Sequence, residues 1–332
     1  MRIAVIGAGR MGAIRVEDLA ADPRVDEVLV TNRTEATATS LASLHGAKVI
    51  PWAERPDINA DGYVIASATD QHVTHLTDAF RFSAPILCEK PISLTPEDDQ
   101  RVIDLAAAAG APIQMAFQRR FDAGIRAMHD AISAGELGTL YGIHILAHDH
   151  TIPRQEFIGG SGGIFRDLHV HDFDLARWLT GAEVASVYAT RAVRHVEFLA
   201  DFDDADVTLI HVVTTNGVQI SISGTRHDAV GHDVRLEAFG TKDSVTAGVN
   251  RRTPLHPLDG DLVMCDPPYV GFVDRFREAF RAETAAFVSF VAGDIPNPCP
   301  PQNARAALQV AMACEESVRT GQPVRVADIM GE

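Results

Sequence analysis

The chain opens with a short apolar run that leads directly into three closely spaced glycines. Residues 3–6 are followed by Gly7-Ala8-Gly9-Arg10-Met11-Gly12, which has the pattern Gly-x-Gly-x-x-Gly. In a strand–turn–helix unit, the first glycine permits a tight turn and the second lets the backbone approach a pyrophosphate. The third lets the helix pack closely on the strand, with the phosphates at the helix N-terminus. The motif therefore predicts an α/β domain that binds a dinucleotide.

Residues 1–118 have the pattern of a doubly wound parallel sheet. Short apolar runs rich in β-branched residues are typical of buried parallel strands, and amphipathic stretches lie between them. One predicted helix has Thr95 as its N-cap, Pro96 at its first position and Gly110 after its last residue. We therefore expect an N-terminal Rossmann domain over residues 1–118. Its predicted strands are residues 3–6, 28–31, 49–50, 63–66, 86–88 and 113–117.

The pattern changes after residue 120. Asn216-Gly217 lies between two alternating runs and predicts a two-residue hairpin. Strands that succeed one another as hairpins imply a large, mostly antiparallel sheet, so residues 119–332 are predicted to form an α+β domain. The predicted strands are residues 140–150, 184–194, 207–214, 218–223, 234–239 and 244–249, and the predicted helices are residues 121–134, 168–179, 273–291 and 303–319.

The acidic composition excludes two classes of partner. The chain has 29 Lys and Arg against 45 Asp and Glu, a formal net charge of −16. A nucleic-acid binder needs a basic surface for phosphates, and anionic membranes attract basic segments. No apolar run is long enough to cross a bilayer or to form a signal-peptide core, and the four cysteines lack Cys-x-x-Cys spacing. We therefore expect a cytoplasmic protein with free thiols that binds neither nucleic acid nor membranes.

The end of the second predicted strand bears on the choice of cofactor. NAD-dependent enzymes usually carry an acidic residue there, which binds the ribose 2′-hydroxyl. This chain has Asn32, which carries no charge to repel a phosphate, followed by Arg33, whose planar guanidinium could bind one. The sequence therefore favours NADP, or use of both cofactors, over strict NAD. An arginine that is simply exposed in a loop is the alternative interpretation.

Several segments, taken in order along the chain, carry a family resemblance. They are the glycine motif, residues 66–72 (ASATDQH), Glu89-Lys90-Pro91 and residues 162–172 (GGIFRDLHVHD). Together they resemble the Gfo/Idh/MocA family of dehydrogenases, named for glucose–fructose oxidoreductase and inositol dehydrogenase, over nearly the whole chain. Residues 118–122 (QRRFD) and 171–174 (HDFD) are most similar to the inositol 2-dehydrogenase branch. The chain departs from the family at Ser67-Ala68-Thr69, where Thr-Pro-Asn is common.

The resemblance implies a reaction and its catalytic residues. Oxidation of a secondary alcohol transfers a hydride to the nicotinamide and a proton to a base, for which histidine is suited near neutral pH. By the resemblance, His171 is that base, Lys90 stabilises the developing alkoxide, and Asp167 supports them. Spaced four residues apart at a helix start, Asp167 and His171 would share one face. The alternatives are a solvated loop residue for Lys90, a helix N-cap for Asp167 and a core histidine for His171.

By the resemblance, the expected enzyme oxidises a cyclitol or sugar, and its C-terminal domain binds substrate and forms homodimers or homotetramers through the open face of its sheet. No metal site is expected. The expected substrate contacts are Lys90, His148, His150, Arg154, Asp167 and His171. The expected cofactor contacts are Gly7, Gly9, Arg10, Met11, Gly12, Asn32, Arg33, Ser67, Ala68, His72, Glu89, Lys90 and Gln118.

The chain contains 14 histidines, which prompts a different hypothesis. His144, His148 and His150 share parity on the predicted strand 140–150 and would face one side. With nearby aspartates they could form the site of a metal-dependent hydrolase or isomerase. That reading leaves the glycine motif and Glu89-Lys90-Pro91 unexplained. We therefore favour a polar wall that contacts the substrate.

A non-catalytic NAD(P)-binding regulator on the same fold is the second alternative, because fold alone does not fix function. Such a protein would be expected to have lost the lysine or the histidine. Lys90, Asp167 and His171 are all present. The sequence therefore favours an enzyme.

Overall fold

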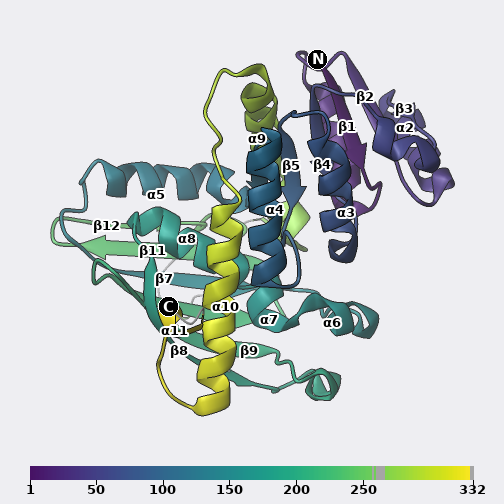
Figure 1. Cartoon of the computed structure of the whole chain (residues 1–332). Coiled ribbons are helices and arrows are strands. Elements are labelled where there is room, and N and C mark those ends of the chain that lie inside the picture. Colours follow the sequence, from purple (N-terminus) through teal and green to yellow (C-terminus); the bar gives the residue numbers. More distant parts are fainter. Residues whose placement is uncertain (256–257, 259–265, 330–332) are drawn as a thin grey trace. The chain divides into compact units, whose positions relative to one another are not determined.

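The computed structural model describes residues 1–255, 258 and 266–329 and contains two compact units (Figure 1). The first comprises Met1–Gln118 and Glu278–Ala306, and the second comprises Arg119–Arg277 and the residues from 307 onward. The division after Gln118 lies where the sequence places it. Residues 278–306, by contrast, were assigned to the C-terminal domain and belong to the first unit. Within the described residues, no helix is both long and apolar enough to span a bilayer.

The first unit is built on a six-stranded parallel sheet with the order β3-β2-β1-β4-β5-β6, which confirms the predicted Rossmann fold. The order reverses between β1 and β4, and ligands of such sheets bind outside the carboxyl ends of the strands at this switch point. Its strands are β1 (Arg2–Ile6), β2 (Glu27–Thr31), β3 (Lys48–Val49), β4 (Gly62–Ile65), β5 (Ile86–Glu89) and β6 (Ile113–Ala116). Its helices are α1 (Arg10–Ala21), η1 (Trp52–Asp57), α2 (Glu35–His45), α3 (Thr69–Phe80) and α4 (Pro96–Ala109).

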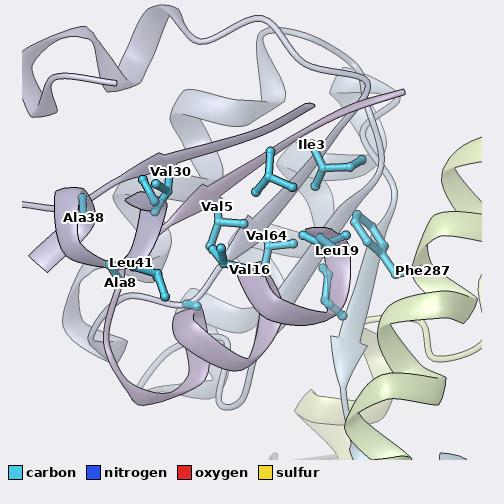
Figure 2. Close-up of a cluster of buried hydrophobic side chains, with 14 of the residues drawn as sticks. Ile3, Val5, Ala8, Val16, Leu19, Val30, Ala38, Leu41, Val64 and Phe287 are labelled. Atoms are coloured by element: carbon cyan, nitrogen blue, oxygen red, sulfur yellow. The ribbon is translucent and has the colours of Figure 1, made fainter. Parts of the chain in front are cut away.

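A cluster of buried apolar side chains joins this sheet to its helices (Figure 2). Val5 and Val64 of the strands pack with Leu19 of α1. Phe287, from helix α9 (Phe272–Ala292), is completely buried in the same cluster. Burial of one such aromatic side chain stabilises the folded state by about 2 kcal/mol relative to leaving it in water. Val288 is buried in the same cluster, so this part of α9 belongs to the first unit.

The second unit contains a seven-stranded sheet with the order β12-β11-β7-β10-β9-β8-β13. β7 and β10 pair in parallel and the other neighbours pair antiparallel, which confirms the predicted, mostly antiparallel sheet. The strands are β7 (Leu140–His148), β8 (Val184–Ala192), β9 (Val207–Thr214), β10 (Gln219–Thr225), β11 (Asp233–Gly240), β12 (Ser244–Ala247) and β13 (Val324–Arg325). The helices are η2 (Gln118–Phe121), α5 (Ala123–Ser133), α6 (Gln155–Ser161), α7 (Gly163–Asp167), α8 (Val170–Thr180), η3 (Glu197–Phe202), α10 (Gln302–Thr320) and α11 (Val326–Ile329).

The two faces of this sheet differ in exposure. Ile143 and Ile145 of β7 are buried, and helix α8 contacts this strand. The side chains that alternate with the buried ones along the strands point to the other face. There, Leu209 of β9 is 60% exposed and Tyr188 of β8 is 40% exposed. These two residues line a shallow hollow of about 620 Å³. One face is therefore the core of the unit, and the other is an apolar surface open to solvent.

Candidate active site

The glycine loop after β1 has the geometry that a dinucleotide requires. Gly7 has a φ of 105°, and a Cβ on it would lie 2.6 Å from the carbonyl oxygen of Ala66. A Cβ on Gly12 would lie 2.0 Å from the carbonyl oxygen of Gly7. At Gly9, by contrast, a Cβ would meet nothing within 4 Å, so space is open beside the backbone at the start of α1. These residues therefore fit a pyrophosphate at the helix N-terminus, with Arg10 and Met11 in the first turn.

The side chain of Asn32 is held at the end of β2. Its Oδ1 accepts from the backbone N–H of Ala8 at 3.1 Å, and its Nδ2 donates to the carbonyl of Thr34 at 3.0 Å. The amide thus connects the end of β2 to the glycine loop, and no carboxylate takes this place. Arg33, the next residue, is exposed.

Two buried histidines of α3 hold the loop that follows β4. His75 Nδ1 lies 2.9 Å from Ser67 Oγ, and His72 Nε2 lies 3.1 Å from the Ser67 carbonyl. His72 Nδ1 lies 2.8 Å from the carbonyl of Pro91, so this ring bridges the loops after β4 and β5. Burial lowers the pKa of both rings, that of His75 to about 4. Both ring nitrogens of His72 thus contact backbone carbonyls of the two loops. The ring therefore supports these loops, whereas the sequence predicts a direct contact with the cofactor.

Glu89 ends strand β5, and its carboxylate is also held inside the first unit. Its Oε1 accepts from Nε and Nη2 of Arg15 at 2.9 and 2.7 Å. Lys90 follows immediately and is partly exposed. Gln118, at the first unit's boundary, is buried, and Ala68 is the exposed N-cap of α3.

In the second unit, Asp167 and His171 lie on two helices rather than one. Asp167 ends α7, a two-residue turn follows, and α8 begins at Val170 with His169 as its N-cap. The single helix expected over residues 168–179 is therefore wrong at its start, and Asp167 is not the N-cap of α8. His171 is in the first turn of α8, 9% exposed.

A buried arginine that the sequence did not identify holds Asp167. Nη1 of Arg226 lies 3.3 Å from Oδ2 of Asp167, and its Nη2 donates to Asp204 at 2.8 Å. Asp204 in turn accepts from the backbone N–H of Ile164 at 2.8 Å, in the first turn of α7. Both ends of the short helix α7 are thus attached to one ion-pair network. The residues involved are 22 to 59 positions apart, so no local sequence pattern reveals the network.

The first turn of α8 is fixed by a second network. The completely buried His169 lies between Asp172 Oδ2 and Thr208 Oγ1, at 2.7 Å from each. Arg119 forms an ion pair with the other oxygen of Asp172, and Arg120 pairs with Asp174 at 2.6 and 2.7 Å. The segments 118–122 and 171–174, noted separately in the sequence, are therefore joined by two buried ion pairs.

The histidines of β7 do not converge on α8. His148 contacts Ser223 Oγ and Asp228, each at 3.2 Å, on the face of the sheet that carries the open hollow. His150, beyond the strand, contacts the carbonyl of Asp228 at 2.8 Å, and Arg154 is exposed at the start of α6. His148 therefore points to the face of the sheet opposite α8, and it does not belong to the expected polar wall beside that helix. In the described part of the chain, no three His, Cys, Asp or Glu side chains are grouped to hold a metal ion.

Comparison with known proteins gives matches to both units. Residues 1–117 match the model for an oxidoreductase family with an NAD-binding Rossmann fold, and residues 125–246 match the GFO/IDH/MocA C-terminal domain. An inositol 2-dehydrogenase of Rhizobium meliloti is 31% identical over 98% of this chain and 99% of the relative. A scyllo-inositol 2-dehydrogenase (NAD(+)) of Bacillus subtilis is 30% identical over 98% and 96%. The crystal structure of a myo-inositol dehydrogenase from Corynebacterium glutamicum superimposes with a TM-score of 0.90, at 32% identity and 98% coverage of each chain.

Proposed function

Because the chain belongs to the Gfo/Idh/MocA family of oxidoreductases, we propose that it oxidises a secondary alcohol of a cyclitol or sugar. The family is NAD(P)-dependent and acts on CH–OH groups, and its inositol dehydrogenases are similar to this chain over nearly its full length. The observation that carries the proposal is the open backbone at Gly9, together with the held carboxylate of Asp167 close in sequence to His171. A nicotinamide cofactor, when bound, supplies the hydride acceptor.

Three side chains have separate roles in the proposed reaction. Lys90 places a positive charge where the alkoxide develops, which stabilises the transition state. His171 accepts the hydroxyl proton through its imidazole, so it acts as the general base. The carboxylate of Asp167 favours the protonated form of that imidazole or binds a neighbouring hydroxyl. The ion pair with Arg226 fixes the position of this carboxylate before substrate arrives.

Of the other expected substrate contacts, we keep two and omit one. His150 and Arg154, in the segment that precedes α7, are retained as substrate contacts, because polyols need several polar partners. His148 is not retained, since its ring faces Ser223 and Asp228.

We infer a preference for NADP over NAD from the end of β2. Asn32 offers no negative charge and its amide is held by Ala8 and Thr34, while the exposed Arg33 has a guanidinium suited to a 2′-phosphate. The proposed assembly is a homodimer or homotetramer formed through the hollow face of the second unit's sheet. Its apolar residues Leu209 and Tyr188 support this, because a contiguous exposed apolar patch marks an interaction surface.

The direct test is a panel of inositols and sugars assayed with NAD and with NADP, following the reduced cofactor. The proposal predicts turnover of at least one cyclitol or sugar and a higher kcat/KM with NADP. A preference for NAD of about a hundredfold would overturn the NADP assignment alone. Cofactor binding without turnover of any member of the panel would favour the non-catalytic regulator.

A further inference from the structure

We propose that Arg15 is a positioning residue that holds Glu89, and through it Lys90, against the helix that begins at the glycine loop. The inference rests on the proposed function, because that function gives Lys90 its role. Arg15 lies one turn beyond Gly12 on α1, and Glu89 directly precedes Lys90 at the end of β5. Neither Arg15 nor its second acidic partner, Glu283, is expected from the sequence motifs.

The guanidinium of Arg15 uses all of its hydrogen-bond donors inside the first unit. Nε and Nη2 donate to Glu89 at 2.9 and 2.7 Å, and Nη2 also donates to Glu283 at 2.5 Å. Nη1 donates to Thr284 Oγ1 at 3.0 Å and to the carbonyl of Phe280 at 3.4 Å. Arg15 and Glu283 are completely buried. An arginine has five N–H donors in a rigid plane, so this geometry leaves none of them unpaired.

The network joins three elements that are remote in sequence. Arg15 belongs to α1, Glu89 to β5 and Glu283 to α9. Arg15 thus pairs with two carboxylates, of which Glu283 is completely buried and Glu89 nearly so. Burial alone would lower the pKa of Arg15, but the adjacent carboxylates of Glu89 and Glu283 outweigh it and raise that pKa above its ordinary value.

This arrangement determines the direction in which the chain leaves β5. Glu89 is the last residue of the strand, and Lys90 is the first residue beyond it. With the carboxylate of Glu89 fixed by two donors of Arg15, the backbone that enters the partly exposed Lys90 is held in place. A displacement of about 1 Å at a catalytic group can cost about a hundredfold in rate. The contact with Arg15 therefore matters for turnover and not only for folding.

The experiment must separate positioning from folding. The Arg15→Met variant removes the cation that pairs with two buried carboxylates, which destabilises the fold whatever the role of Arg15. The double variant Arg15→Met/Glu283→Met removes one cation and one carboxylate together, so the net charge does not change, and it fills the space with apolar groups. In this variant Glu89 loses its contact with Arg15. Arg15→Lys keeps the cation but offers at most three donors and no planar fork. Arg24→Met is the matched control, because Arg24 also bonds α9, at Ser289 and Ala285, without contacting Glu89.

Thermal unfolding, fluorescence titration with the reduced cofactor, and kcat and KM for the best alcohol are measured for each variant. We expect the double variant and Arg15→Lys to bind the cofactor within about threefold of wild type and to lose at least about tenfold in kcat, with little change in KM. The Arg24→Met control should keep its kcat. A folded double variant with wild-type kcat overturns the inference, and if it does not fold, Arg15→Lys with wild-type kcat overturns it equally. A wild type that oxidises no alcohol overturns the proposed function itself.

Discussion

Asp99 lies in the first turn of α4, completely buried, with Oδ1 accepting from the hydroxyl of Ser93 at 2.5 Å. Burial raises the pKa of this carboxyl to about 7, against which the Ser93 hydrogen bond and the charge of Arg305 act more weakly. The group is therefore protonated in the folded chain at pH values where it is ionised in the unfolded chain. Between about pH 4 and pH 7 the folded state holds the additional proton, so this group makes stability fall as pH rises through that window.

We predict that Asp99→Asn removes this dependence. The free energy of unfolding of wild type should decline from pH 5 to pH 8 by up to a few kcal/mol more than that of the variant, since each pKa unit is worth about 1.4 kcal/mol. Chemical denaturation at both pH values measures the difference. Asp98→Asn, at the neighbouring half-buried carboxylate that pairs with Arg101, is the control and should behave as wild type. An equal decline in Asp99→Asn and wild type would show that Asp99 does not titrate in this range.

At the scale of elements, the contact of His169, the N-cap of α8, with β10 depends on one glycine. A Cβ on Gly224 would lie 2.3 Å from Cε1 of His169 and 2.8 Å from Oγ1 of Thr208. Because His169 is completely buried between Thr208 and Asp172, it has no room to move aside. Gly224 is thus required by the network that holds the first turn of α8.

We predict that Gly224→Ala destabilises the fold by about 1–3 kcal/mol and lowers turnover, because His169 must leave its partners. Equilibrium unfolding and kcat test this together. Gly160→Ala is the control, since a Cβ there would meet nothing within 4 Å. If Gly224→Ala matches the control in both measurements, His169 does not fix α8.

The sequence predicted the elements better than the contacts between them. All strands except the two-residue β13 are predicted, because buried apolar runs and the Asn216-Gly217 turn are local signals, and Thr95 and Gly110 flank α4 as expected. The break between α7 and α8 could not be predicted, because it accompanies the contacts of His169 with a strand 39 residues away. The amphipathic pattern of α9 likewise predicts an apolar face, but it does not indicate which sheet packs against that face.

The same distinction holds for the candidate site. Its candidate residues Lys90 and His171 are predicted from short patterns. Arg15 and Arg226, which hold Glu89 and Asp167, were missed because their partners are 59 to 74 residues away and their burial is a property of the fold. Buried ion pairs of this kind leave no periodic signal in a sequence.

At the scale of the whole molecule, the open face of the second unit predicts self-association. Leu209→Lys would place a charge in the apolar hollow, and burial of an unpaired charge at an interface is unfavourable. We predict that this variant shifts the molar mass measured by light scattering to that of a smaller species. Leu44→Lys, on α2 in the first unit and 76% exposed, is the control and should retain the wild-type mass. A wild type that is monomeric at micromolar concentration would contradict the proposed assembly.

We propose that Lys90 and His171 both take part in the oxidation of the alcohol. The most direct measurement is the turnover of Lys90→Met and His171→Asn with the best substrate of the panel, together with their affinity for the reduced cofactor. We expect each variant to lose at least about a hundredfold in kcat, as removal of general-base or electrostatic catalysis does, while the dissociation constant of the cofactor changes by less than about threefold. Turnover within about threefold of wild type in both folded variants would contradict it.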